Sequence, residues 1–427
     1  MVGNSTGSKA KLGLFAATAL IMGNMIGSGV FLLPVSLAPY GWNGVLGWIL
    51  TIAGTLVLAL VLVRLTRAED TTSFIIAGFG ELPGFIIGWS YLVSLWVGIA
   101  AIAVAGISYL MSLVSAIAST AYGPALATLA LIWSVTAINL RGTRSAGNFQ
   151  VLTLAIKLIP LVLVIILAAM ALLGGSAQVA HFDPVSINGS KVNAAASLTL
   201  WALLGFEAAS LVARRVRDPE VNVPRATILG TGLAGVLYLL VCSAIALLLP
   251  QEMISNSSAP FATFVAHFWR PEVAMFIAAF AVVSCVGAVN GWVLVQGELP
   301  HAMAERGLLP PWFAQIDERN TPRRNLIIGS LIASAFVLLN SSRSVQGIFE
   351  FLILLGTCGA LWLYLVCALV ALKLNIARGL AMIGVVYSVW ALWGAGFEAL
   401  GWSVVLMLAG LPIWLWMQRA DRVEEPA

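Results

Sequence analysis

The sequence has very little charge. Only 9% of its 427 residues are Asp, Glu, Lys or Arg, whereas 60% are hydrophobic. A soluble globular domain carries about 25% charged and about 45–50% apolar residues. So few charges cannot cover the surface of a compact soluble fold. The composition therefore excludes a soluble protein and predicts an all-α integral membrane protein.

Cysteine and histidine are also scarce. The four cysteines lie inside apolar runs, which argues against a disulfide framework. The three histidines, His181, His267 and His301, fall in loops or at span ends and do not cluster, so we expect neither a zinc site nor a membrane metalloprotease. We therefore expect no metal and no cofactor.

Long apolar runs, in contrast, fill the chain. A helix needs about 20 apolar residues to cross the hydrocarbon core. Reading for such runs between charged or Pro/Gly-rich breaks predicts twelve spans, at residues 12–35, 43–63, 82–114, 123–139, 149–173, 194–213, 227–249, 272–298, 325–340, 345–374, 379–395 and 399–417. Residues 299–316, which contain Pro310 and Pro311, predict a short interfacial helix between two of them.

Basic residues lie mainly on one side of the predicted membrane. With both termini inside, 18 of the 22 Lys and Arg residues fall in inside loops, three (Lys191, Arg270 and Arg343) fall outside, and Lys157 lies within a span. This asymmetry follows the positive-inside rule. It predicts cytoplasmic termini (1–11 and 418–427) and excludes a nucleic-acid partner, which would require one contiguous basic face.

The first span contains an unusual break. Gly23, Gly27 and Gly29 lie among Asn24 and Ser28, and each interior glycine disfavours a helix by about 1 kcal/mol relative to alanine. A broken helix would direct free N–H groups at an anion such as a carboxylate. Alternatively, Gly23 and Gly27 form a face that allows close helix packing. Span 1 alone does not decide between these interpretations.

The sixth span favours the broken helix. Gly205 precedes Glu207 by two residues inside an apolar run, and an ionisable group there is a functional candidate. Spans 1 and 6 are five apart, which is typical of a transporter built from two inverted five-helix repeats. We expect repeats at 12–173 and 194–374, with two additional helices at 379–417.

Lys157 is the only cation well inside a predicted span. Its long side chain could reach the interface from near a helix end. Because Lys157 lies two turns or more inside span 5, we favour a function instead. A lysine removed from water can exchange a proton or replace a bound cation.

Several motifs resemble those of the amino acid–polyamine–organocation (APC) transporters. They are Ile26-Gly27-Ser28-Gly29-Val30-Phe31, Trp201 with Gly205-Phe206-Glu207, Asp218-Pro219 followed by Asn222-Val223-Pro224-Arg225, and Glu305-Arg306-Gly307-Leu308-Leu309-Pro310. The resemblance covers nearly the whole chain. It is strongest to the bacterial arginine/agmatine antiporter branch of the basic amino acid/polyamine antiporters.

The resemblance assigns roles to individual residues. It implies that Ser28 and Gly29 meet the substrate carboxylate, and that carbonyls of Met25, Trp201 and Leu204 meet its amino group. Trp201 resembles an outer aromatic gate and Trp292 an aromatic floor, and both could hold a cation by cation–π contact. The expected substrate-binding set is Asn24, Met25, Ile26, Ser28, Gly29, Ser94, Ile99, Trp201, Leu204 and Trp292. Lys157 and Glu207 are the expected proton-coupling residues.

Three positions depart from the arginine branch. Ile99 stands where those exchangers have an Asn, which favours a smaller or more apolar substrate side chain. Lys157 is absent from that branch and is typical of proton-coupled, sodium-independent members of the superfamily. The segment Ala68–Phe74 replaces a Pro-x-x-Gly-Gly-x-Tyr motif at the cytoplasmic entry to span 3.

These observations predict a sodium-independent, secondary-active amino acid transporter of the inner membrane that works by alternating access. Exchange of one amino acid for another, or for an amine, is favoured by the branch. The alternative, favoured by Ile99 and Lys157, is proton-driven symport of neutral amino acids. A channel would require symmetric rings of charged side chains or backbone carbonyls, which the two asymmetric broken helices fit poorly. An enzyme would require a set of catalytic side chains within the spans, and the sequence contains no such set. Expected partners are a small amino acid or amine, the lipid bilayer and, as a candidate, protons. A homodimer is compatible with this interpretation.

Overall fold

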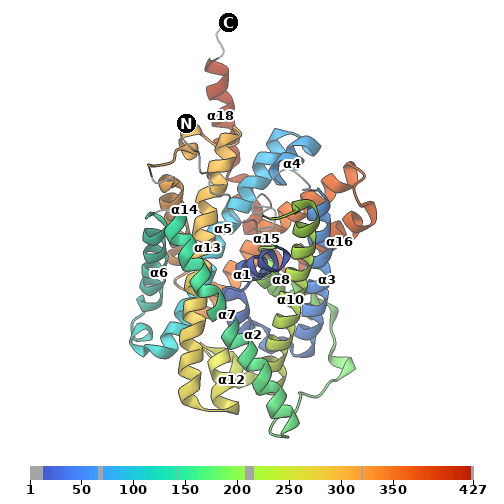
Figure 1. Ribbon diagram of the computed structural model, residues 1–427, viewed down its shortest axis with the longest axis vertical. Helices are drawn as coiled ribbons and strands as arrows, with labels where there is room; N and C mark the ends of the chain where they lie inside the picture. Colours follow the sequence, from blue (N-terminus) through green and yellow to red (C-terminus); the bar gives the residue numbers. More distant parts are fainter. Residues whose placement is uncertain (1–12, 66–70, 142, 207–215, 319–320, 425–427) are drawn as a thin grey trace, which may run out of the picture.

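The computed structural model describes residues 13–65, 71–141, 143–206, 216–318 and 321–424, and these residues form a helical bundle (Figure 1). The first half contains α1 (Leu14–Met25), α2 (Ser28–Leu37), α3 (Trp42–Leu65), α4 (Thr71–Phe79), α5 (Glu81–Leu113), α6 (Gly123–Asn139) and α7 (Thr143–Leu173). The second half contains α8 (Gly189–Leu203), α10 (Pro219–Leu248), α11 (Gln251–Ser255), α12 (Pro260–Phe268), α13 (Pro271–Glu305), α14 (Arg323–Leu339), α15 (Val345–Lys373), α16 (Arg378–Gly394), α17 (Gly396–Leu408) and α18 (Leu411–Glu424).

Many of these helices are long and apolar enough to cross a membrane. Among the described residues, seven stretches meet this criterion: Trp42–Leu65, Glu81–Leu113, Ile156–Leu173, Pro219–Leu248, Pro271–Glu305, Val345–Lys373 and Gly396–Arg419. Three shorter apolar helices, Gly29–Tyr40, Gly123–Asn139 and Arg378–Gly394, lie between them. A helix rises 1.5 Å per residue, so the 24 residues of α3 span about 36 Å. The prediction of an all-α, multi-span membrane fold is confirmed.

The helices pair reciprocally across the two halves of the chain. The third-span helix α5 packs against α15, and its counterpart in the second half, α13, packs against α7. In the same way α3 packs against α8, whereas α10 packs against α1. Two copies of one five-helix unit would show this reciprocity. The exact repeat boundaries, 12–173 and 194–374, stay a prediction.

The short helix α4 lies at one end of the bundle, and α12 lies at the other (Figure 1). The sequence did not predict α4, which Gly80 separates from α5 with φ +94°, a left-handed conformation that glycine adopts without strain. Lys373 at the end of α15 donates from Nζ to the carbonyl oxygen of Gly78, at 2.6 Å. Arg306, just after α13, donates to Ser73 Oγ at 2.6 Å. The side chains of Lys373 and Arg306 therefore hold α4 against the ends of α15 and α13.

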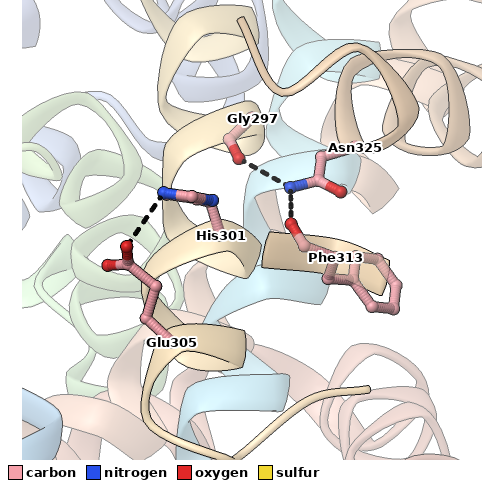
Figure 2. A network of polar contacts seen from close by, with 5 residues as sticks. All are labelled: Gly297, His301, Glu305, Phe313 and Asn325. Atoms are coloured by element: carbon pink, nitrogen blue, oxygen red, sulfur yellow. Dashed lines mark hydrogen bonds and ion pairs between the residues drawn. The ribbon is translucent and has the colours of Figure 1, made fainter. Parts of the chain in front are cut away.

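A second polar cluster joins the C-terminal end of α13 to the start of α14 (Figure 2). The buried side chain of Asn325 donates from Nδ2 to the carbonyl oxygens of Gly297, at 3.1 Å, and of Phe313, at 2.9 Å. Within α13, His301 Nε2 lies 3.4 Å from a carboxylate oxygen of Glu305. Asn325 thus ties the α13–α14 connection to both helices.

The prediction of a separate interfacial helix at 299–316 is wrong. Helix α13 continues without interruption through Pro300 to Glu305, and Gly307, with φ +72°, then reverses the chain. A short 3-10 turn, Pro311–Ala314, follows. Pro300 lies inside α13, because a long helix that packs against several neighbours tolerates the loss of one backbone hydrogen bond.

Candidate functional site

The first predicted break lies between α1 and α2. Helix α1 ends at Met25, Ile26 is extended (φ −71°, ψ 92°), and α2 begins at Ser28. Met25, Ile26 and Gly27 are buried. The first N–H groups of a helix have no partner inside the helix, so the start of α2 presents donors in the middle of the bundle. The broken-helix interpretation of span 1 therefore holds, and close packing also contributes, since a methyl group at Gly27 would lie 3.0 Å from Ala288 Cβ.

Lys157, on α7, contacts the last turn of α1 just before this break. Its Nζ, on the fully buried side chain, donates to the carbonyl oxygen of Gly23 at 3.1 Å. In a continuous helix that oxygen would accept from the N–H of Gly27, and the break removes this donor. Helix α13, which packs against α7, carries the buried Cys285. Within the described residues, no carboxylate forms an ion pair with Lys157.

The second break ends α8. The helix stops at Leu203, Leu204 is extended (φ −66°, ψ 148°), and Gly205 has φ +106°, where a side chain would be strained. Phe206 is buried against Tyr364, with ring centroids 4.9 Å apart. Glu207 lies outside the described residues. The end of α8 therefore directs its last carbonyl groups into the bundle, as the sequence predicts for a broken span 6.

A cavity lies between the two breaks. The space between its lining atoms, including the part open to solvent, is about 480 Å³. Its walls come from both breaks and from three long helices, α5, α13 and α15, and the lining residues are Met25, Gly27, Gly29, Tyr91, Ser94, Leu95, Gly98, Ile102, Trp201, Ala202, Leu204, Trp292 and Ala360. Ligand pockets are commonly lined in this way, by apolar and aromatic side chains with a few polar groups.

The described walls carry no charged side chain. Their side-chain polar groups are the hydroxyls of Ser94 and Tyr91 and the indole N–H groups of Trp201 and Trp292. The Ser94 hydroxyl already donates to the carbonyl oxygen of Tyr91 at 2.7 Å. Recognition of a charged small molecule here would therefore depend on the backbone groups of the two breaks and on aromatic faces.

Six of the ten expected substrate-binding residues line the cavity. They are Met25, Gly29, Ser94, Trp201, Leu204 and Trp292. Ile26 is buried at the break, and Ile99 is buried on α5; neither lines the cavity. Asn24 and Ser28 lie at the break, but their side chains are outside the described part of the structure. The substrate contacts themselves stay a prediction.

The sequence interpretation missed several lining residues on α5. Tyr91, Leu95, Gly98 and Ile102 join Ser94 along one face of this helix. Residues three or four apart lie on the same helix face, so extending the stripe from Ser94 at that spacing would have found them. Ala360 comes from α15, and only the close packing of α15 on α5 brings it to the cavity.

Comparison with known proteins identifies the family. The amino acid permease family model matches residues 12–420. The chain belongs to the amino acid permease family. It is 30% identical to the cadaverine/lysine antiporter of Escherichia coli K12 over 336 residues, which cover 78% of this chain and 75% of that protein. It is 29% identical to the putrescine transporter PotE of the same strain over 419 residues, or 94% of each. It is 30% identical to PotE of Haemophilus influenzae over 416 residues, covering 94% and 95%.

The match confirms the predicted resemblance and extends across both helix breaks, the cavity and Lys157. An amino acid permease moves its substrate through the protein, so a central cavity between interrupted helices is where a transported molecule is expected to bind. The names of these relatives refer to lysine and to the diamines cadaverine and putrescine.

Proposed function

We propose that this permease is a sodium-independent antiporter that exchanges one amino acid for another or for an amine. The cavity between the two helix breaks is the observation that carries this proposal. Similarity to a cadaverine/lysine antiporter and a putrescine transporter supports exchange of cationic substrates. Proton-driven symport of neutral amino acids gains no support from these relatives.

The two breaks offer complementary groups for an amino acid backbone. The N–H groups at the start of α2 would bind the substrate carboxylate, since a helix N-terminus carries partial positive charge. The carbonyl groups of Met25, at the end of α1, and of Leu204, directly after α8, would accept from the α-ammonium. The substrate side chain would then lie between the indole rings of Trp201 and Trp292. A cationic end group would interact with these aromatic faces.

Lys157 would hold the first break in place of a bound cation. A buried ammonium costs several kcal/mol unless it is hydrogen-bonded, and the carbonyl oxygen of Gly23 is its acceptor. One fixed positive charge between α1, α7 and α13 makes a sodium ion at this position unnecessary. Deprotonation of the amine would release α1, which is how a proton could be coupled to the transport cycle. Glu207 is the second proposed proton-coupling residue.

The α4 end of the bundle would face the cytoplasm of a bacterial inner membrane. Lys373 and Arg306 both contact α4 at this end. Arg64 lies in the last turn of α3, next to α4. Basic residues concentrate on the cytoplasmic side of membrane proteins. With this orientation both termini are cytoplasmic.

Transport by the purified protein in sodium-free liposomes tests the proposal. Labelled lysine is supplied outside, and the liposomes contain unlabelled lysine, cadaverine, putrescine, leucine or nothing. We expect labelled lysine to enter when the inside holds lysine or a diamine, and not when the liposomes are empty. Uptake of labelled leucine into empty liposomes, driven by an inward proton gradient, would instead establish the symporter and overturn the proposal.

A further inference from the structure

The indole ring of Trp201 lies against three glycines from three different helices. A methyl group at Gly29 of α2 would lie 3.0 Å from Trp201 Cδ1. At Gly98 of α5 it would lie 2.9 Å from Cη2, and at Gly356 of α15 it would lie 2.9 Å from Cζ3. Real Cβ atoms essentially never approach other atoms as closely as 2.9 Å, and a distance of 3.0 Å is tighter than nine in ten real Cβ contacts. The ring can therefore occupy its position only because Gly98 and Gly356 have no side chain, and at Gly29 a side chain would press on both the ring and the backbone of Ala202.

The contacts between α5 and α15 show why the ring fits at this level. One to two turns away, the two helices touch directly: Ser90 Oγ donates to the carbonyl oxygen of Gly359 at 3.2 Å. A methyl group at Gly359 would lie 2.9 Å from Ser94 Cβ. At the next turn, Gly98 and Gly356 leave a gap, and the six-membered ring of Trp201 fills it. The indole ring of Trp201 therefore separates α5 and α15 at this level, although the two helices are in direct contact elsewhere.

The same ring lines the cavity together with Gly98 and Gly29. Its five-membered ring touches α2 and its far edge touches α5 and α15, so it extends from one helix break across to the two long helices. The position of this ring consequently sets how much of the cavity is available to a substrate side chain.

We propose that Gly29, Gly98 and Gly356 form a seat for Trp201, and that Gly98 and Gly356 are positioning residues that determine substrate size. The seat holds the ring in the cavity wall without displacing the helix backbones. A side chain at either position would push the ring toward the substrate. The role in substrate selection rests on the proposed function, whereas the seat itself does not.

A thermal-stability cycle tests the seat without any transported substrate. Gly356→Ala is made in the native chain and in a Trp201→Leu chain, whose side chain is too short to reach Gly356. We expect Gly356→Ala to lower the Tm by about 3 °C or more in the native chain, because overpacking strains a close-packed interior. In the Trp201→Leu chain it should leave the Tm unchanged or raise it, since alanine is the better helix former.

Gly232→Ala is the matched control, because a methyl group at this glycine of α10 meets no atom within 4 Å. It should not lower the Tm in either chain. If Gly356→Ala lowers the Tm equally with and without Trp201, the proposed seat is refuted. The alanine would then collide with a neighbouring helix and not with the indole ring. If Gly356→Ala prevents folding of the native chain, recovery of folded protein in the Trp201→Leu chain supports the seat, and failure in both chains refutes it.

Exchange in liposomes tests the effect on substrates. Gly98→Ala should raise the KM for the largest exchanged substrate more than for the smallest, by about threefold or more, because the displaced ring occupies cavity space. In the double variant with Trp201→Leu, the change in KM should no longer depend on the size of the substrate. An equal change in KM for all substrates would contradict the role in substrate size. Absence of exchange by the unmodified protein would refute the proposed function while leaving the stability cycle as the test of the seat.

Discussion

The Nζ of Lys157 lies 3.1 Å from the carbonyl oxygen of Gly23, and this contact joins α7 to the last turn of α1. The acceptor is free because the helix breaks after Met25, and the donor is fully buried. A helix interruption and a buried cation, both visible in the sequence, therefore form one structural unit. This unit lies next to the start of α2, where the substrate carboxylate is proposed to bind.

Replacing Lys157 should slow transport strongly while the protein still folds. Lys157→Met keeps most of the length of the side chain but removes the charge and the donor to Gly23. We expect exchange in sodium-free liposomes to fall by about tenfold or more, because a hydrogen bond from a charged donor contributes about 1.5–3 kcal/mol. Lys191→Met, at an exposed position near the start of α8, is the control and should exchange normally. Unchanged exchange by Lys157→Met would refute the role of this amine.

Trp292 should contribute to binding of cationic substrates. In Trp292→Leu we expect the KM for lysine or a diamine to rise by about 2- to 30-fold, the range that a cation–π contact supplies. Trp292→Phe should retain part of the affinity. Trp393, which is 67% exposed on α16, provides the control substitution Trp393→Leu with no expected change in KM. Equal KM values for Trp292→Leu and the unmodified protein would exclude a cation–π contact at this position.

Lys373 should hold α4 against α15. Its Nζ donates to Gly78 at 2.6 Å and lies 5.0 Å from the ring centroid of Phe79. We expect Lys373→Met to speed hydrogen–deuterium exchange of residues 71–79 by about tenfold, since a charge-assisted hydrogen bond is lost. Arg378→Met removes an exposed basic residue near the same end and should leave this exchange unchanged. Identical exchange in both variants would show that other contacts hold α4.

Asn325 should matter more for stability than an exposed asparagine. It is buried and satisfies two carbonyl groups, those of Gly297 and Phe313 (Figure 2). Asn325→Ala leaves both without this donor and should lower the free energy of unfolding by about 1–3 kcal/mol. The exposed Asn256 donates only within its own turn, so Asn256→Ala should change stability little. Comparable Tm values for the two variants would contradict this account.

Much of the fold could be predicted from the sequence because the membrane imposes strong constraints. Within the described residues, each of the twelve predicted apolar ranges overlaps one or two helices of the structure. Both breaks were also predicted, since Gly23–Gly29 and Gly205 interrupt otherwise apolar runs. Helix α4 and the continuation of α13 to Glu305 were not predicted. Their ends depend on single backbone conformations at Gly80 and Gly307, which hydropathy does not report.

The site was only partly visible in the sequence. Residues at the two breaks were found, because their composition is locally unusual. Gly98 and Gly356 were not, because a glycine in an apolar span looks the same whether it faces lipid, another helix or an indole ring. Their importance depends on the packing of α5 against α15 around Trp201, which brings together residues more than 100 positions apart in the chain.

The most direct test of the central claim asks whether substrate occupies the cavity between the two breaks. The four native cysteines are buried, so Ser94→Cys places a single accessible thiol in the cavity wall, and Ser176→Cys places one in an exposed loop. The rate of labelling by a small thiol reagent is measured with and without an exchanged substrate. At a substrate concentration about ten times its Kd, mass action predicts that labelling of Ser94→Cys slows by about tenfold, with Ser176→Cys unchanged. Equal labelling of Ser94→Cys with and without substrate would contradict binding in this cavity.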